Sequence, residues 1–189
     1  MEVPKLVEDA VALAERLGFL HSSIPEIGRL LHVLVAARPD GRVAEIGTGC
    51  GVGAAWIASA LGKRGRLVTV ELDSGRAGAA AKLFTARPEV VVLNGDWHAA
   101  LPPEAPFDLL FLDGGHWKQR PFEEAPRALE LLAPGGLVVI DDLTPPELWP
   151  EEWRGRPDQV RRFWLEHRSL TAVEIRTTPE TAAILAVKR

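Results

Sequence analysis

Four glycines at alternate positions follow a short apolar segment and could cradle a charged cofactor. Residues 43–53 read Val-Ala-Glu-Ile-Gly-Thr-Gly-Cys-Gly-Val-Gly, and the apolar residues 54–58 follow directly. Glycine lets the backbone approach a ligand without a Cβ atom in the way, and the start of the next helix offers unpaired N–H groups to a carboxylate or phosphate. The segment therefore predicts a binding site for a nucleotide-like cofactor, without saying which one.

The spacing of these glycines bears on the class of cofactor. A dinucleotide fingerprint needs glycine or alanine at its sixth position. Counted from Gly47 that position is Val52, and counted from Gly49 it is Ala54, which fits only if the strand ends later than its apolar pattern indicates. The acidic form, Glu45-Ile46-Gly47-Thr48-Gly49-Cys50-Gly51, resembles motif I of the class I S-adenosylmethionine-dependent methyltransferases. This resemblance implies that Glu45, Gly47, Gly49 and Gly51 belong to an S-adenosylmethionine site.

A second group of residues consists of carboxylates at or just after the ends of predicted strands. In open α/β sheets, ligands bind outside the carboxyl ends of the strands, so we expect these side chains at one rim. Like charges gathered there repel one another unless a cation is present. The set therefore predicts a sulfonium cofactor, a metal ion or both, and comprises Glu71, Asp96, Asp113, Asp141 and Asp142.

Two of these carboxylates are candidates for holding the nucleoside part of the cofactor. Glu71 ends the second predicted strand, where a carboxylate can accept both hydroxyls of a ribose; the alternative of a helix N-cap suits Asp73 better. Asp96 follows the third strand, at the position that would meet an adenine amino group, and the alternative is a plain turn residue. Trp97 beside it is a candidate for stacking on the adenine, for lining the pocket or for core packing.

The remaining three aspartates suggest a cation site. Asp113 ends one predicted strand and Asp141-Asp142 end the next, with one helix between, so the two strands should be neighbours. An all-oxygen set suits a hard divalent cation such as Mg²⁺, which would lower the pKa of a substrate hydroxyl and orient its oxygen. In the alternative, Asp113 contacts cofactor or substrate directly, Asp142 caps a loop and no metal binds.

A more specific resemblance covers roughly residues 24–142. The run from Phe111 to Arg120, Phe-Leu-Asp-Gly-Gly-His-Trp-Lys-Gln-Arg, resembles the segment of the catechol O-methyltransferase group in which an aspartate metal ligand precedes His-Trp-Lys. Residues 132–142 and 70–73 are similar to that group's segment after the helix and to its ribose segment. The resemblance implies Asp113 as a metal ligand and Lys118 as the general base.

Two departures from that group bear on the chemistry. Gly114-Gly115 is an insertion that lengthens the loop and yields Asp-Gly-Gly-His, similar to a related methyltransferase group for which no metal is assumed. His116 is therefore a second candidate base, because an unperturbed imidazole titrates near neutral pH. The second departure is Asp142, where the metal-dependent group usually has asparagine; a third carboxylate still binds a cation, with more charge.

The elements that must position these residues alternate between strand and helix. Helices are predicted at 3–17 and, opened by a capping box at Ser23, to Ala37; later helices are predicted at 53–61, 74–86, 121–132 and 158–167. Strands are predicted at 42–46, 66–71, 90–93, 108–112, 136–140, 171–176 and 182–188. The last two are too close in sequence for a crossover, so they must pair antiparallel. The prediction is an α/β, Rossmann-like methyltransferase fold: a seven-stranded, mostly parallel sheet with an antiparallel last strand and helices on both faces.

Composition limits the remaining function classes. The 189 residues, 47% hydrophobic, are expected to form a single domain (1–189), in which helices within 1–38 precede the sheet and are candidates for pairing two subunits in a homodimer. One cysteine, Cys50, excludes a disulfide framework and is interpreted as a packing residue rather than a nucleophile. A net charge of −4, no apolar span and no signal peptide predict a cytoplasmic protein without a nucleic-acid or membrane partner.

The combined prediction is an S-adenosylmethionine-dependent O-methyltransferase that acts on a hydroxyl of a small molecule with Mg²⁺ assistance. Trp117, Trp149 and Trp153 are expected at the same rim, on loops that include a proline-rich lid over 145–157, and would suit a flat, aromatic acceptor. The arginines between 154 and 168 are interpreted as a solvated mixed-charge helix face, with recognition of an acidic substrate group as the alternative. The alternatives are a metal-independent methyltransferase, a cofactor-binding protein without catalysis, and an NAD-dependent dehydrogenase.

Overall fold

The computed structural model describes residues 2–114 and 120–189. The two predicted bases, His116 and Lys118, and Trp117 between them lie outside the described residues. The helices are α1 (Lys5–Arg16), α2 (Pro25–Ala37), α3 (Val52–Ala58), α4 (Ser74–Leu83), α5 (Trp97–Ala100), α6 (Pro121–Glu130) and α7 (Gln159–Glu166), with 3₁₀ turns η1 (Pro102–Glu104), η3 (Pro146–Leu148) and η4 (Glu151–Trp153).

Seven strands form one sheet in the order β3-β2-β1-β4-β5-β7-β6. The strands are β1 (Arg42–Ile46), β2 (Arg66–Glu71), β3 (Val90–Asn94), β4 (Phe107–Leu112), β5 (Leu132–Leu143), β6 (Leu170–Arg176) and β7 (Ala182–Lys188). β1 to β5 run parallel, and β7 lies antiparallel between β5 and β6. The predicted Rossmann-like methyltransferase fold is therefore confirmed, including the antiparallel C-terminal hairpin.

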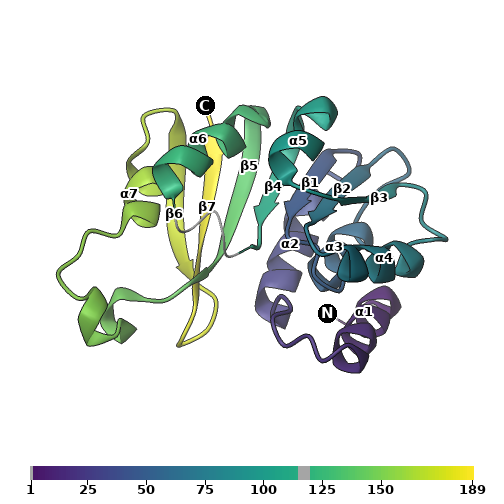
Figure 1. The fold of residues 1–189 in the computed structure, drawn as a ribbon. Coiled ribbons are helices and arrows are strands. Elements are labelled where there is room, and N and C mark those ends of the chain that lie inside the picture. Colours follow the sequence, from purple (N-terminus) through teal and green to yellow (C-terminus); the bar gives the residue numbers. More distant parts are fainter. Residues whose placement is uncertain (1, 115–119) are drawn as a thin grey trace.

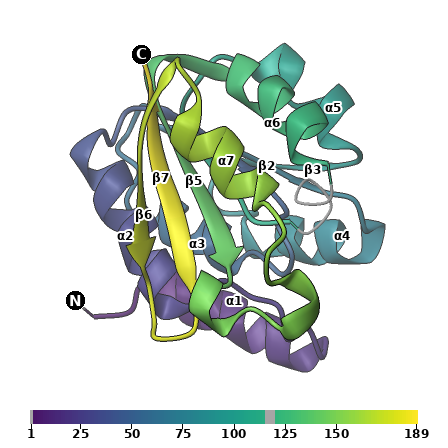
Figure 2. The ribbon, with the colours of Figure 1, turned by 90° about the vertical axis from the view of Figure 1, so that its left-hand side faces the viewer.

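Helices cover both faces of the sheet, as Figures 1 and 2 show from two sides. Helices α1 to α4 pack on one face around a buried cluster that includes Trp56 and Phe111. Helices α5 to α7 pack on the other around a cluster that includes Phe107 and Trp164. Because β1 leads to α3 on the first face and β4 leads to α6 on the second, the chain leaves these neighbouring strands in opposite directions, which opens a crevice at their carboxyl ends.

The predicted capping box at Ser23 is wrong, although α2 ends at Ala37 as expected. The residue that caps α2 is Ile24, which has no side-chain hydrogen bond, and proline stands at the first helical position. Proline has no N–H to be capped, so the helix start needs one acceptor fewer. The Ser23 hydroxyl instead donates to Asp113 Oδ2 at 2.9 Å and ties the segment before α2 to the end of β4.

Two further elements differ from prediction. β5 extends from Leu132 to Leu143, well beyond the predicted 136–140, because it pairs with β4 on one side and β7 on the other. The short helix α5, which begins at Trp97 and is capped by Asp96, was not predicted. Across the described part of the chain, no helix has the length and apolarity needed to cross a membrane.

Candidate cofactor and metal site

A cavity of about 910 Å³ lies at the carboxyl ends of β1, β2 and β4, where the crevice of the sheet was expected. Its wall is formed by the glycine-rich loop after β1, the ends of β2 and β4, the start of α5 and the segment before α2. Most of the predicted site residues meet here. Those lining the cavity are Gly47, Gly49, Glu71, Asp96, Trp97, Asp113 and Asp142.

The loop from Gly47 to Gly51 requires glycine for two different reasons. Gly47 has φ +99°, and a Cβ at this position would lie 2.2 Å from the backbone oxygen of Asp113. The loop after β1 therefore lies directly against the end of β4. Gly51 caps α3 with φ +91°, and a Cβ at this position would lie 3.1 Å from the Phe84 ring. Gly47 and Gly49 line the cavity, whereas Gly51 is not among the described residues that do, and its contact with a cofactor stays a prediction.

Glu71 organises the loop and the start of α4 with a single carboxylate. Its Oε2 accepts from the backbone N–H of Gly49 at 2.8 Å, and its Oε1 accepts from the N–H of Asp73 at 2.9 Å. Arg76 donates to the same Oε1 at 2.8 Å. Asp73, not Glu71, is the N-cap of α4, as expected. Part of the positive charge predicted at this rim is therefore supplied by Arg76, which sequence reasoning missed.

Glu45 lies behind the loop and is not among the described residues that line the cavity, so its contact with a cofactor stays a prediction. The side chain is fully buried, and its Oε2 accepts from the Thr69 hydroxyl at 2.5 Å. Thr69 in turn contacts the Thr48 hydroxyl at 2.6 Å, so the loop is joined to β1 through a buried polar chain. Burial raises the pKa of the Glu45 carboxyl well above its usual range, and the charges of Asp113 and Glu71 raise it further. Glu45 is therefore a support of the loop.

Asp96 and Trp97 form a second polar cluster with two residues that the sequence did not single out. Asp96 Oδ1 accepts from the backbone N–H of His98 at 3.0 Å and contacts His98 Nδ1 at 2.7 Å. His98 Nε2 contacts Glu124 of α6 at 2.5 Å, and the Trp97 and His98 rings stack with centroids 4.0 Å apart. All four residues line the cavity. One face of Trp97 is thus covered by His98.

The three remaining aspartates converge as predicted. One carboxylate oxygen from each of Asp113, Asp141 and Asp142 lies within 4.8 Å of the others. Asp141 is buried and accepts from the backbone N–H of Asp142 at 2.7 Å, while Asp142 has the left-handed φ of 57° that aspartate and asparagine tolerate best. Three close carboxylate oxygens are the donor set that a hard divalent cation prefers, so the residues present fit such an ion.

Cys50 is 1% exposed, and burial raises the pKa of its thiol. A thiol that holds its proton is a poor nucleophile. The position and the pKa both agree with the predicted packing role.

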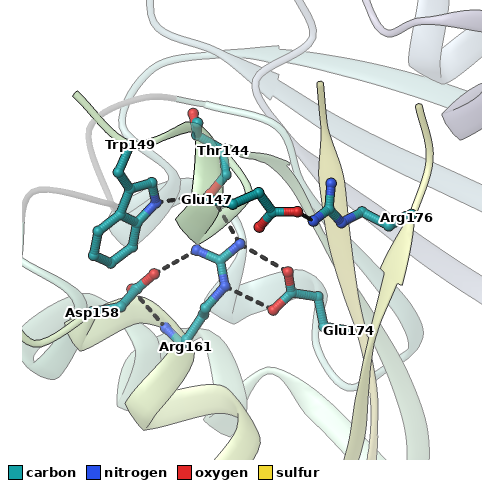
Figure 3. A network of polar contacts seen from close by, with 7 residues as sticks. All are labelled: Thr144, Glu147, Trp149, Asp158, Arg161, Glu174 and Arg176. Atoms are coloured by element: carbon teal, nitrogen blue, oxygen red, sulfur yellow. Dashed lines mark hydrogen bonds and ion pairs between the residues drawn. The ribbon is translucent and has the colours of Figure 1, made fainter. Parts of the chain in front are cut away.

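The arginines and tryptophans near the C-terminus lie apart from the cavity wall. Figure 3 shows Arg161 of α7 contacting Asp158, Glu174 and the backbone oxygen of Thr144, to which the Trp149 indole also donates. Arg161 is therefore a structural cation within a polar network, which corrects its interpretation as part of a solvated surface. Trp149 and Trp153 pack edge to face in the segment that follows β5. None of the described residues from 145 to 157 lines the cavity.

Comparison with known proteins gives concordant results. Residues 44–143 match a family model described as a methyltransferase domain. The chain is 30% identical over 151 residues to a catechol O-methyltransferase of Niastella koreensis. This match covers 72% of this chain and 67% of that protein. It is 36% identical over 121 residues to protein-L-isoaspartate O-methyltransferase 1 of Archaeoglobus fulgidus. This match covers 62% of this chain and 53% of the relative. The chain thus spans between about half and two thirds of the length of these relatives.

Solved structures share the fold over nearly the whole chain. The O-methyltransferase TomG from Streptomyces achromogenes, solved in complex with SAM, is 28% identical with a TM-score of 0.80, and the match covers 99% of this chain and 91% of that one. The O-methyltransferase from Bacillus cereus in complex with SAH is 23% identical with a TM-score of 0.81, and the match covers 100% of this chain and 93% of that one. At this identity the likeness shows the fold alone. Because the family model matches more than half of the residues, the chain belongs to the methyltransferase domain family, among the class I S-adenosylmethionine-dependent O-methyltransferases.

Proposed function

We propose that this protein transfers the methyl group of S-adenosylmethionine to a hydroxyl oxygen of a small molecule, with a divalent cation held by Asp113, Asp141 and Asp142. The observation that carries the proposal is that one cavity is lined both by the glycine-rich loop with Glu71 and by Asp113 and Asp142. A cofactor cradle and a cation site at the same cavity can bring a methyl donor and a hydroxyl acceptor together.

The cofactor end of the cavity offers groups that suit the adenosyl part of S-adenosylmethionine. Gly47 and Gly49 line the cavity beside Glu71, to which we assign the ribose hydroxyls, and beside Asp96 and Trp97, to which we assign the adenine. When bound, S-adenosylmethionine supplies a methyl carbon made electrophilic by the sulfonium. The acidic lining of Glu71, Asp96 and Asp113 favours that cation over its neutral product, which assists product release.

The acceptor end has two tasks, orientation and deprotonation. A cation held by the three aspartates would lower the pKa of the acceptor hydroxyl, and Mg²⁺ suits their all-oxygen chemistry. Lys118 and His116 are the proposed bases, because they follow Asp113 closely in the chain. Bringing the acceptor oxygen and the methyl group into line then accounts for much of the rate enhancement.

The nature of the acceptor and the cellular setting belong to the same proposal. The proposed acceptor is flat and aromatic, as the similarity to a catechol O-methyltransferase suggests; Trp149 and Trp153, on the segment after β5, are not among the described residues that line the cavity. A single cysteine suits a reducing cytoplasm. The exposed apolar side chains Leu20 and Val33, 90% and 60% exposed, support a homodimer formed through the N-terminal segment.

Calorimetric titration tests the proposal. S-adenosylmethionine should bind with micromolar affinity, and Mg²⁺ should bind separately. Asp141→Asn and Asp142→Asn should each weaken Mg²⁺ binding by about tenfold or more, because each removes a charged ligand oxygen. Asparagine at 142 keeps a residue type that tolerates the left-handed backbone, whereas alanine would add strain.

Asp108→Asn is the matched control. Asp108 lies on β4, the strand that leads to Asp113, but at its other end, where it accepts from the backbone N–H of Arg42. An amide oxygen can still accept that bond, so Mg²⁺ affinity should not change. Cofactor binding without any Mg²⁺ binding would leave a metal-independent methyltransferase, and absence of cofactor binding would refute the proposed function altogether.

A further inference from the structure

His98 connects two helices through two carboxylates. Its Nδ1 contacts Asp96 Oδ1, at the start of α5, at 2.7 Å, and its Nε2 contacts Glu124 Oε2, on α6, at 2.5 Å. The His98 side chain is 28% exposed and that of Glu124 is 19% exposed. A histidine held at both ring nitrogens cannot rotate without breaking a contact, so the imidazole is fixed in position and in orientation.

The contacts of His98 act on the Asp96 carboxylate, which only accepts hydrogen bonds when it is ionised. The hydrogen bond from the His98 backbone N–H, together with the contact of its side chain, lowers the pKa of Asp96 and keeps that carboxylate ionised. Arg127 of α6 adds to this effect. Asp96 is thus maintained as an acceptor.

The same contacts determine which oxygen of Asp96 is available. Oδ1 accepts both the backbone N–H and the ring of His98, whereas among the residues that the structure describes none donates a hydrogen bond to Oδ2. The Asp96 side chain is 61% exposed and lines the cavity. The Trp97 ring stacks on the imidazole of His98, with the ring centroids 4.0 Å apart. Oδ2 is therefore the atom with which Asp96 can accept a bond from a ligand.

We propose that His98 is a positioning residue that holds Asp96 to accept a hydrogen bond from the 6-amino group of the cofactor's adenine, and so sets the selectivity for adenine over purines that lack this group. The proposal rests on the proposed function, since it assumes that the adenosyl moiety occupies this part of the cavity. A histidine that merely pins α5 to α6 would contribute to stability without affecting the choice of base.

The test compares two ligands on the same protein. One is S-adenosylhomocysteine, and the other is its 6-deamino analogue, in which hydrogen replaces the adenine amino group. Both dissociation constants are measured by calorimetry for the wild type and for His98→Ala, His98→Asn and Glu123→Gln. Asparagine carries an N–H close to the position of Nδ1, so it can still donate to Asp96 while losing Glu124. Glu123 neighbours Glu124 on α6 and is the matched control, since it contacts the exposed Arg120 and not His98.

The wild type should prefer S-adenosylhomocysteine by about tenfold or more, as expected for a hydrogen bond to a charged acceptor. His98→Ala should reduce the preference to about twofold or less, because Asp96 then keeps only the bond from the backbone N–H of residue 98, while His98→Asn should keep most of it and Glu123→Gln all of it. The proposal is overturned if the wild type binds both ligands equally, or if His98→Ala weakens both in proportion and leaves their ratio unchanged. Failure of the wild type to bind either ligand would instead refute the proposed function. If His98→Ala does not fold, the ratio of the two dissociation constants is compared between His98→Asn and Asp96→Asn. His98→Asn should keep the preference for S-adenosylhomocysteine, and Asp96→Asn should lose it.

Discussion

At the scale of single residues, Glu45 couples the fold to pH. Its carboxyl group is fully buried beneath the glycine-rich loop, and Oε1 has no hydrogen-bond partner among the described residues. An ionised carboxylate without full hydrogen bonding is costly in such a place, so the group holds its proton in the folded state. Since the unfolded chain has no such burial, the two states bind different numbers of protons over a range of pH.

This difference predicts that the protein becomes less stable as pH rises above the usual pKa of glutamate. In that range the unfolded Glu45 has lost its proton and the folded one retains it, so the folded state binds more protons and stability falls by up to about 1.4 kcal/mol per pH unit. The fall ends where pH passes the raised pKa of the folded state. Glu45→Gln should remove this dependence, and urea unfolding at a series of pH values, with a chelator present, measures it.

Glu151→Gln is the control for that series, because Glu151 is exposed in the turn after β5. Its stability curve should run parallel to that of the wild type. A Glu45→Gln curve that also runs parallel would show that Glu45 is ionised in the folded protein.

The sequence predicted the position of those site residues that end a strand. Asp113, Asp141 and Glu71 each stand at the carboxyl end of a predicted strand, and parallel strands bring these ends to one edge of the sheet. Arg76 and His98 were missed, because their contacts depend on how α4 and α5 are set against those ends. One signal was available for Arg76: a helix that starts directly after Glu71 must place its first turn above that carboxylate.

At the scale of elements, one guanidinium group connects three parts of the C-terminal half. The Arg161 side chain, 11% exposed, reaches Asp158 at the start of α7, Glu174 on β6 at 2.7 and 2.8 Å, and the backbone oxygen of Thr144 at 3.1 Å. β6 is an edge strand, held by β7 on one side only. The network therefore fixes this edge and the segment after β5 to α7 (Figure 3).

We predict that Arg161→Ala destabilises the protein by about 2 kcal/mol, because it leaves two little-exposed carboxylates without their cation. Arg162→Ala, one residue along the same helix, should cost less than about 0.5 kcal/mol, since its contact with Glu166 is long and exposed. Urea unfolding measures both, and hydrogen exchange should show faster opening of β6 in the first variant only. Equal effects of the two substitutions would contradict the assigned role.

The alternation of strands and helices, and the antiparallel end, were predictable because buried parallel strands read as continuous apolar runs and the last connection is too short for a crossover. The start of β5 was not, because Leu132-Ala133-Pro134-Gly135-Gly136 carries no strand pattern. It joins the sheet through the pairing of Leu132 with Phe107, a tertiary contact that overrides local preference. The short helix α5 was missed for the related reason that four residues show no periodicity.

At the scale of the whole molecule, the cavity draws on distant parts of the chain but not on all of it. The hydrogen bond from Ser23 to Asp113 joins residues 90 positions apart, so the segment between α1 and α2 is part of the site. Among the described residues, those that line the cavity end at Asp142, and the hairpin of β6 and β7 contributes none. That hairpin nevertheless completes the sheet, because β7 pairs with β5 over most of its length. Whether a ligand stabilises it depends on how cooperative the sheet is.

We predict that S-adenosylhomocysteine, at about 100 times its dissociation constant, stabilises β7 as much as β1, by about 2.7 kcal/mol. Binding favours only the folded state, and a sheet that unfolds as one unit passes this free energy to every strand whose amides exchange by global unfolding. Hydrogen exchange of the buried amides of Ala44 and Ile184, with and without ligand, measures the two strands separately. Glu71→Gln should reduce the ligand-induced protection of the Ala44 and Ile184 amides by the same amount, because weaker binding of the ligand stabilises the whole folded state less. Protection confined to Ala44 would show that residues 1–189 contain two cooperative units rather than the single domain that the sequence predicts, with the boundary between β4 and the C-terminal strands.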